Sequence, residues 1–285
     1  VFADWANPYL TMSKDYVANI VRDLGPISNA GNLYKGNKPV YWCANCATAL
    51  ADAEIEYQEH TSPSIYVKFY LDEESSKKFE KLIPKSWPKE QWEKKRVAFV
   101  IWTTTPWTLP ANLAIALHPD FDYATINTGS ELLIVAEGLR EKFLKESGLS
   151  EQGDATLGKG RLFEGLKAKH PFMNRTSLLI LGEHVTLEAG TGAVHTAPGH
   201  GVDDYKVGQK YGLDVIAPVD LYGKFTDEVP AYKGMKVFDA NKSIVENLQA
   251  SGHLIKVSHI QHSYPHCWRC NKPVIFRATP QWFIG

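Results

Sequence analysis

The chain has 285 residues, 44% of them hydrophobic, and a formal net charge of −1 at pH 7. This length and composition support one large folded domain or two smaller ones, and the charge balance demands no nucleic-acid partner. No apolar run approaches the roughly 20 residues that span a membrane. The N-terminus has no charged start, no apolar signal core and no initiating Met. We therefore expect an intracellular, cytoplasmic protein and a piece of a longer chain.

In chain order, periodicity predicts a helix over residues 13–24 that stops at Gly25-Pro26, and an exposed Lys/Glu-rich helix and loop over 74–96. Strand candidates lie at 64–71, 97–102, 111–117, 123–127, 132–136 and 177–182. A hairpin-like pair of strands is expected over 183–198, and helices over 138–147, 203–212 with its own acidic cap, and 240–250. Many short strands with a few helices predict an α+β fold, a β-barrel core with surrounding helices.

All four cysteines fall into two CxxC pairs, Cys43 with Cys46 and Cys267 with Cys270. Each CxxC turn places two thiolates on one side of a tight knuckle, and two knuckles complete a tetrahedral Zn²⁺ site. Without a secretory signal a disulfide framework is less favoured. A thioredoxin-type redox centre would need only one pair, and four unrelated thiols would not be expected to fall into pairs. A site closed by four protein ligands is structural, and a shared metal would bring both ends of the chain together.

In the stretch "IWTTTPWTLPAN", three adjacent threonines, Thr103 to Thr105, follow an apolar segment. Hydroxyls buried without partners are costly. These side chains therefore either line a small polar pocket or belong to a polar turn in which they bond to nearby backbone.

A second stretch, "GTGAVHTAPGHGVDDY", places His195, His200, Asp203 and Asp204 among glycines, which let backbone approach a ligand closely. The spacing of the two histidines is not a standard metal motif. Helix capping would account for one of the two aspartates, and His195 taken alone could be a structural histidine.

Together these two stretches resemble the editing domain of class I aminoacyl-tRNA synthetases, the isoleucyl branch in particular. "NPYLTM", "KPVYWCANCATALADAEIEY" and "HSYPHCWRC", with "IFRATPQWF", look like the connective-peptide stalk and zinc ribbon of bacterial forms. The resemblance thus covers essentially the whole chain. Leucyl and valyl relatives tend to carry an arginine where this chain has Thr105, which favours the isoleucyl branch. HIGH-like and KMSKS-like ATP motifs are absent from the sequence, so amino-acid activation is not expected.

The resemblance implies an aminoacyl-tRNA deacylase that hydrolyses valine mis-attached to isoleucine tRNA, with valyl-adenylate as a second substrate. One methylene is worth only about 1–3 kcal/mol of discrimination, a magnitude for which this enzyme family is itself the standard example. A second, smaller site must therefore remove the wrong product. Direct attack by water is expected, because no nucleophile with a paired base is evident.

The resemblance also implies roles for individual residues. The catalytic set is Asp204, Thr103, Thr104 and Thr105, and the substrate-binding set is His195, Trp107, Asn112 and His200. In this interpretation Asp204 pairs with the α-ammonium of the amino acid, and the threonines and Trp107 position the water and the terminal adenosine. His195 lies against the aliphatic side chain and helps to exclude isoleucine, and Asn112 supports the edge of the pocket.

Residues 1–60 and 259–285 are expected to form the two halves of a zinc-ribbon stalk, and residues 61–258 the editing domain. Loss of the structural zinc is expected to leave the pocket largely intact. The implied partners are the aminoacylated 3′ end of tRNA and the remainder of the synthetase chain, with no membrane. One alternative is a non-catalytic zinc-ribbon module that binds tRNA by stacking bases on Trp268 and Tyr264. Another is the editing domain of a valyl- or leucyl-type enzyme.

Overall fold

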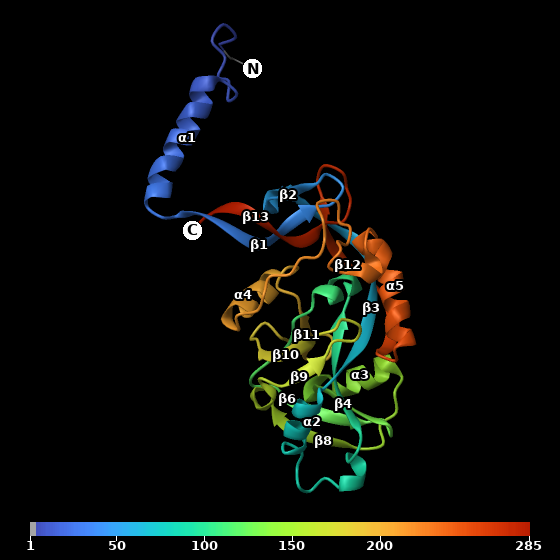
Figure 1. The fold of residues 1–285 in the computed structure, drawn as a ribbon. Helices are drawn as coiled ribbons and strands as arrows, with labels where there is room; N and C mark the ends of the chain where they lie inside the picture. The colour runs from blue at the N-terminus through green and yellow to red at the C-terminus, as the bar shows by residue number, and fades with distance from the viewer. Residues whose placement is uncertain (1–3) are drawn as a thin grey trace. The chain divides into compact units, whose positions relative to one another are not determined.

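The computed structural model describes residues 4–285, and the chain divides into two compact units (Figure 1). One unit combines the residues up to 38 with 279–285, and the other comprises residues 39–278. The helices are α1 (Lys14–Asn29), α2 (Glu73–Glu80), α3 (Arg140–Ser147), α4 (Val202–Lys210) and α5 (Val237–Ala250). The strands are β1 (Leu33–Cys43), β2 (Thr48–Leu50), β3 (Ile55–Tyr70), β4 (Arg96–Thr103), β5 (Ala114–Leu117), β6 (Asp122–Asn127), β7 (Glu131–Ala136), β8 (Asp154–Lys159), β9 (Lys167–Lys169), β10 (Thr176–Leu181), β11 (Ala193–Thr196), β12 (Leu254–Cys267) and β13 (Ile275–Ile284).

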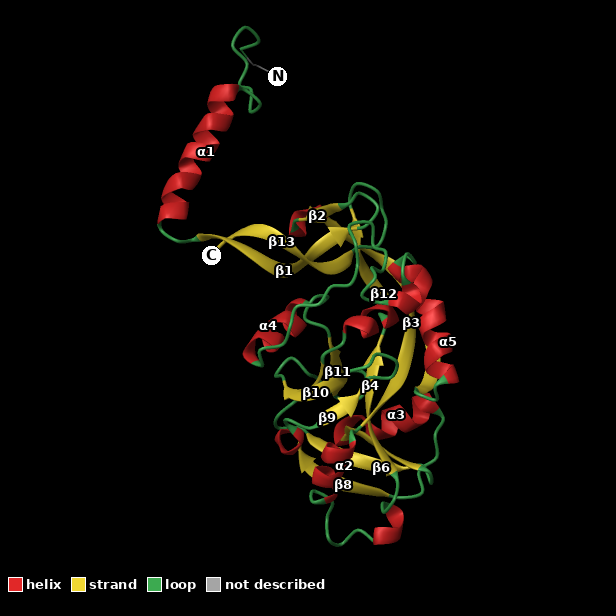
Figure 2. Ribbon diagram, in the orientation of Figure 1, coloured by secondary structure: helices red, strands yellow, loops and turns green. Residues whose placement is uncertain are grey.

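These strands form three sheets, with the orders β12-β3-β4-β7-β6-β8, β11-β5-β10-β9 and β13-β1-β2 (Figure 2). The mixed α and β composition that the sequence predicts is confirmed. The β-barrel core is not found, because no ladder among residues 4–285 closes a sheet on itself. The six-stranded sheet stays open because β12 pairs only with β3, and no ladder in the described part of the chain joins β12 to β8 at the opposite edge. Strand patterns predict strands but not their partners.

Several local predictions differ from the structure. The strand predicted over 64–71 is the end of the longer β3, and the one predicted over 111–117 is confined to β5. Three further differences concern helices and a loop. The helix predicted over 13–24 continues to Asn29 through Pro26, whose ring removes only one donor, and Ala30 N–H closes the last turn on the Pro26 carbonyl. The hairpin predicted over 183–198 contains one strand, β11, and its first half is a loop. Helix α4 begins at Val202 after an N-cap Gly201 that makes no side-chain cap, so the acidic residues lie inside the first turn.

The main core of the unit 39–278 takes its residues from the six-stranded sheet, the four-stranded sheet and α5. Its largest fully buried side chains are aromatic and aliphatic, among them Phe69, Phe79, Phe99, Tyr123 and Phe163. The Tyr123 hydroxyl donates to the Gly192 carbonyl at 2.6 Å, and Ala136 N–H donates to the Thr191 carbonyl at 2.7 Å. The core sheet thereby holds the loop that leads into β11. Helix α5 packs against β12 and against the 3₁₀ helix Pro106–Ala111, which follows β4.

Helix α1, in the other unit, carries an apolar face with nothing packed on it among the described residues. Val17, Ile20, Val21 and Leu24 are all exposed, and α1 has no buried residue. Within residues 4–285 no helix is both long enough and apolar enough to cross a membrane.

Candidate active site

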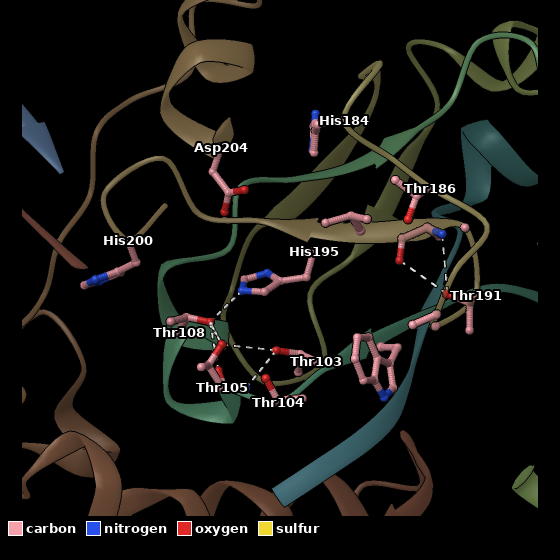
Figure 3. A pocket seen from close by; sticks show the side chains of 16 residues that line it. Thr103, Thr104, Thr105, Thr108, His184, Thr186, Thr191, His195, His200 and Asp204 are labelled. Atoms are coloured by element: carbon pink, nitrogen blue, oxygen red, sulfur yellow. Dashed lines mark hydrogen bonds between the residues drawn. The ribbon is translucent and has the colours of Figure 1, made fainter. Parts of the chain in front are cut away.

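A cavity of about 310 Å³ lies where the end of β4, the strand β11 and the first turn of α4 meet (Figure 3). Its lining includes Thr103, Thr104, Thr105, Thr108, His184, Thr186, His195, His200 and Asp204. The structure therefore brings together the two unusual stretches of the sequence. Figure 3 shows Thr103, Thr104, Thr105 and Thr108 on one side of His195 and Asp204 on the other.

The threonine hydroxyls form a short chain at the end of β4. Thr105 N–H donates to Thr103 Oγ1 at 3.1 Å, and the hydroxyl oxygens of these two residues lie 3.3 Å apart. The Thr108 hydroxyl donates to the Thr105 carbonyl at 2.9 Å. The side chain of Thr104 makes no hydrogen bond within residues 4–285. The stretch is thus both a turn, in which some hydroxyls bond to local backbone, and a cavity wall that leaves one hydroxyl for a ligand.

The imidazole of His195 is buried and held at both nitrogens. Asn112 Nδ2 lies 2.8 Å from Nδ1, and Thr108 Oγ1 lies 2.8 Å from Nε2. An amide nitrogen can only donate, so Nδ1 accepts and Nε2 carries the proton that goes to Thr108. Burial lowers the pKa of His195 to about 3, and this side chain is therefore neutral at physiological pH.

The carboxylate of Asp204 is half-buried at the start of α4. Its Oδ2 accepts from Ala197 N–H at 2.8 Å, which holds the carboxylate against β11. Burial raises the pKa of Asp204 to about 6, and neighbouring Asp203 adds to the effect. Asp203 itself points to solvent, 3.6 Å from Lys206 Nζ, and does not line the cavity. A carboxylate that lines a cavity and has no cationic side chain beside it favours the binding of a ligand with a positively charged group.

The remaining predicted substrate-binding residues lie in different places. Asn112 is fully buried behind His195 and does not line the cavity. Trp107 is also buried, and its ring meets that of His200 edge to face at 4.9 Å. His200 lines the cavity, but its Nδ1–H donates to the Phe276 carbonyl of β13 at 2.8 Å. Burial lowers the pKa of His200 to about 4.

The loop around His200 requires a glycine. A Cβ at position 199 would overlap the Ile216 carbonyl oxygen, and the Gly199 carbonyl accepts from Ala278 N–H at 2.8 Å. Residues 199 and 200 are thus both hydrogen-bonded to β13, which follows the second CxxC pair along the chain.

Sequence reasoning missed several lining residues. Thr108 lies inside the quoted stretch and could have been singled out by its spacing from Thr105 on a tight helical turn. His184 and Thr186 lie on the loop before β11 and carry no local signal, because only the fold brings that loop to the cavity.

The four cysteines gather at a second site. The Sγ atoms of Cys43, Cys46, Cys267 and Cys270 all lie within 4.8 Å of one another, and those of Cys43 and Cys270 are 3.5 Å apart. A tetrahedron with Zn–S bonds of about 2.3 Å has sulfurs about 3.8 Å apart, so this donor set fits a metal ion of that kind. Each knuckle is followed by a residue in the left-handed region, Ala47 at φ 50° and Asn271 at φ 53°.

Comparison with solved structures identifies the class of fold. The chain is similar to the editing domain of the cytosolic leucyl-tRNA synthetase of P. knowlesi, with a TM-score of 0.54, 12% identity, and coverage of 76% of this chain and 99% of that one. The corresponding domain of P. falciparum gives a TM-score of 0.53 at 15% identity, over 69% of this chain and 99% of that chain. The chain therefore has the fold of these editing domains.

Comparison of sequences identifies the family. The model for class I tRNA synthetases (I, L, M and V) matches residues 1–285. The isoleucine–tRNA ligase of Petrotoga mobilis is 52% identical over 100% of this chain, and that of Geobacter sulfurreducens 51% identical over the same share. The chain belongs to the class I tRNA synthetase family. It spans 29% and 30% of the lengths of these two relatives.

Proposed function

We propose that the chain is the editing domain of an isoleucyl-tRNA synthetase and hydrolyses the ester between valine and the terminal ribose of isoleucine tRNA, with valyl-adenylate as a second substrate. The family and the relatives named isoleucine–tRNA ligase support the choice of enzyme. The fold supports the choice of domain.

The observation that carries the proposal is the placement of Asp204. Its carboxylate lines a cavity that Thr104 and Thr105 also line, and its raised pKa indicates that its charge is poorly compensated by the protein. An α-ammonium supplies the missing positive charge, and a hydrogen bond between charged groups of this kind is worth roughly 1.5–3 kcal/mol. Because both valyl esters and valyl-adenylate carry an α-ammonium, one carboxylate serves either substrate.

Hydrolysis then needs a positioned water near the ester carbonyl. In this proposal the free hydroxyl of Thr104 and the chain of Thr103 and Thr105 hold that water and the ester. With pKa values of about 3 and 4, His195 and His200 are poor general bases at physiological pH. For the tRNA ester we therefore assign activation of the water to the vicinal hydroxyl of the substrate's own terminal ribose.

Size selection falls to His195. Its ring is fixed by Thr108 and Asn112, so the wall it forms cannot move aside at low cost. A rigid wall excludes one methylene better than a mobile one, because a mobile side chain can repack around the larger ligand. In this proposal Asn112 acts on the substrate only through His195, and His200 positions its loop.

The two CxxC pairs, in this proposal, hold one structural Zn²⁺. Four thiolate donors with no open position suit a structural rather than a catalytic metal. Residues 1–60 and 259–285 would be the two stalk halves and 61–258 the hydrolytic domain, in a cytoplasmic enzyme. The exposed apolar face of α1 supports a further partner, the remainder of the synthetase chain, because surfaces of this kind are normally covered.

The decisive experiment compares deacylation of valyl- and isoleucyl-tRNA, both made on isoleucine tRNA, by the full-length protein. We expect rapid release of valine and slow release of isoleucine. A protein that binds the tRNA and releases neither amino acid would favour a non-catalytic tRNA-binding module. Preferential release of threonine from valine tRNA would favour a valyl-type enzyme.

A further inference from the structure

Behind the wall that His195 forms lies a strand, β10, that no step of the proposed function uses. β10 pairs in parallel with β5, and β5 pairs with β11, the strand that carries His195. Ser177 lies near the start of β10, is fully buried and does not line the cavity. Any effect of Ser177 on a ligand must therefore pass through other side chains.

The side chain of Asn112 joins Ser177 to His195. The amide nitrogen of Asn112 donates one proton to the Ala114 carbonyl and the other to His195 Nδ1, both at 2.8 Å. Because a backbone carbonyl can only accept, the Ala114 contact settles which end of the amide is nitrogen. The amide oxygen, Oδ1, then faces Ser177, whose hydroxyl donates to it.

The donors in this buried series all point the same way. The hydroxyl of Ser177 donates to Asn112, and the amide of Asn112 donates to His195. The Nε2–H of His195 donates to Thr108, whose hydroxyl donates to the Thr105 carbonyl in the cavity wall. Hydrogen bonds in such a series polarise one another, and removing one member leaves a buried polar group unpaired. Ser177 is thus connected to the cavity wall by hydrogen bonds alone.

The backbone of Asn112 is held by a different residue. Arg175 Nε donates to the Asn112 carbonyl at 3.0 Å, and the Nη2 of the same guanidinium donates to the Pro110 carbonyl. Since Arg175 fixes the main chain, the contribution that remains for Ser177 is the orientation of the Asn112 amide. Loss of the Ser177 hydroxyl should therefore loosen the amide and leave the course of the chain unchanged.

We propose that Ser177 is a positioning residue for size selection: its hydroxyl holds the Asn112 amide, and through that amide it holds the His195 ring that excludes the additional methylene of isoleucine. The inference rests on the proposed function, because that function makes His195 the wall of the valine pocket. Without the hydroxyl, Asn112 Oδ1 is a buried acceptor with no donor, and the amide is free to turn toward another one. An imidazole that moves with the amide can repack around a larger ligand.

The test is Ser177→Ala in the full-length protein, with kcat/KM for valyl-tRNA and isoleucyl-tRNA measured separately. We expect the ratio of kcat/KM for valyl- over isoleucyl-tRNA to fall about three- to tenfold, the range that corresponds to one net hydrogen bond. The fall should come from faster release of isoleucine. Ser177→Thr keeps the hydroxyl and should restore the wild-type ratio. An unchanged ratio in Ser177→Ala would overturn the inference.

The matched control is Ser75→Ala. Ser75 is also buried, and its hydroxyl oxygen accepts from Lys167 N–H at 2.8 Å, but it does not line the cavity. Denaturant titrations should show a similar loss of stability in both alanine variants, and Ser75→Ala should keep the wild-type ratio. If the ratio fell equally in both, the cause would be general loosening of the core and the assigned role of Ser177 would be wrong.

A double-mutant cycle determines whether Ser177 acts through Asn112. Asn112→Ala removes the connecting amide, so the further change Ser177→Ala should leave the ratio where Asn112→Ala alone puts it. Additive effects of the two changes would show that Ser177 reaches the site by another path and would contradict the proposal. Wild-type protein that releases neither amino acid, or both equally, would instead refute the proposed function itself.

Discussion

His195 and Thr108 join the two halves of the candidate active site through a 2.8 Å hydrogen bond between Nε2 and Oγ1. His195 comes from β11 and Thr108 from the 3₁₀ helix after β4, and the Thr108 hydroxyl donates its own proton to the Thr105 carbonyl at 2.9 Å. Every donor in this series has an acceptor, so the position of the imidazole is determined by the fold rather than by the ligand.

Shortening this wall should change size selection. His195→Ala removes the imidazole and opens space beside the substrate side chain, so the variant should begin to deacylate isoleucyl-tRNA. One methylene gives roughly 10–200-fold discrimination, and we expect the ratio of kcat/KM for valyl- over isoleucyl-tRNA to fall at least about tenfold. His170→Ala is the control, since it removes another buried imidazole that does not line the cavity. Unchanged discrimination in His195→Ala would assign the wall to another residue.

Neighbouring aspartates should differ sharply in their importance. Asp204→Ala should reduce valyl-tRNA deacylation at least about tenfold, because each 1.4 kcal/mol of lost transition-state binding corresponds to about one decade. Asp203→Ala should stay near wild type, since Asp203 faces solvent beside Lys206. Circular dichroism of both variants checks the fold. Loss of activity in Asp203→Ala alone would show that Asp203, and not Asp204, binds the ammonium.

The rate of editing should depend on the charge of Asp204. With a pKa of about 6 this carboxyl is protonated in mildly acidic solution and loses its attraction for an ammonium. We expect kcat/KM to rise about tenfold per pH unit below pH 6 and to level off above it. His195 and His200, with pKa values of about 3 and 4, titrate below this window, and burial also lowers the pKa of His184. In Asp204→Asn the inflection near pH 6 should disappear, and an unchanged inflection would attribute it to another group.

Buried histidines should make the fold sensitive to acid. Burial lowers the pKa values of His170 and His195 to about 3 and that of His200 to about 4. Their stabilising contribution is complete above the pKa of about 6.5 that a histidine has in the unfolded chain, and it is lost as the pH falls. Below that pH the unfolded chain binds protons at these histidines and the native state does not. Asp204 has a raised pKa and is protonated in the native state near pH 5. Its proton is released on unfolding and offsets one of the three protons that the histidines take up.

These four groups by themselves give a net uptake of about two protons on unfolding, which corresponds to a loss of roughly 2.7 kcal/mol of unfolding free energy per pH unit near pH 5. The lowered pKa values of His60, His184 and His253 act in the same direction. Denaturant titrations at pH 7, 6 and 5 measure this slope. A stability that is flat across this range would show that the histidines are more accessible to protons than their burial indicates.

Metal removal should affect the pocket as well as the stalk. Elemental analysis should find one Zn²⁺ per chain, and Cys43→Ser should lose it. Sequence alone predicts an intact pocket after loss of zinc. Because Gly199 and His200 are hydrogen-bonded to Ala278 and Phe276 of β13, we expect instead that deacylation falls together with the metal. Normal deacylation by a zinc-free Cys43→Ser protein would support the simpler expectation.

Some features of this protein can be predicted from sequence because their signals are local. Two CxxC pairs predict a sulfur cluster, and the structure brings the four Sγ atoms together. The threonine stretch and the glycine-rich loop are each unusual alone, and the structure places both at one cavity. A loop that must approach other backbone closely requires glycine, as Gly199 does, and this requirement is visible in the sequence before the fold is known.

Other features depend on contacts between distant segments. Only the fold places Thr108 and Asn112 on the two nitrogens of His195, and only the fold brings the Ser177 hydroxyl to the amide of Asn112. The open sheets could not be predicted for the same reason, since periodicity identifies a strand but not the strand beside it. Local sequence determined which residues could do chemistry here, and long-range packing decided which of them meet, because hydrogen bonds and burial act through space.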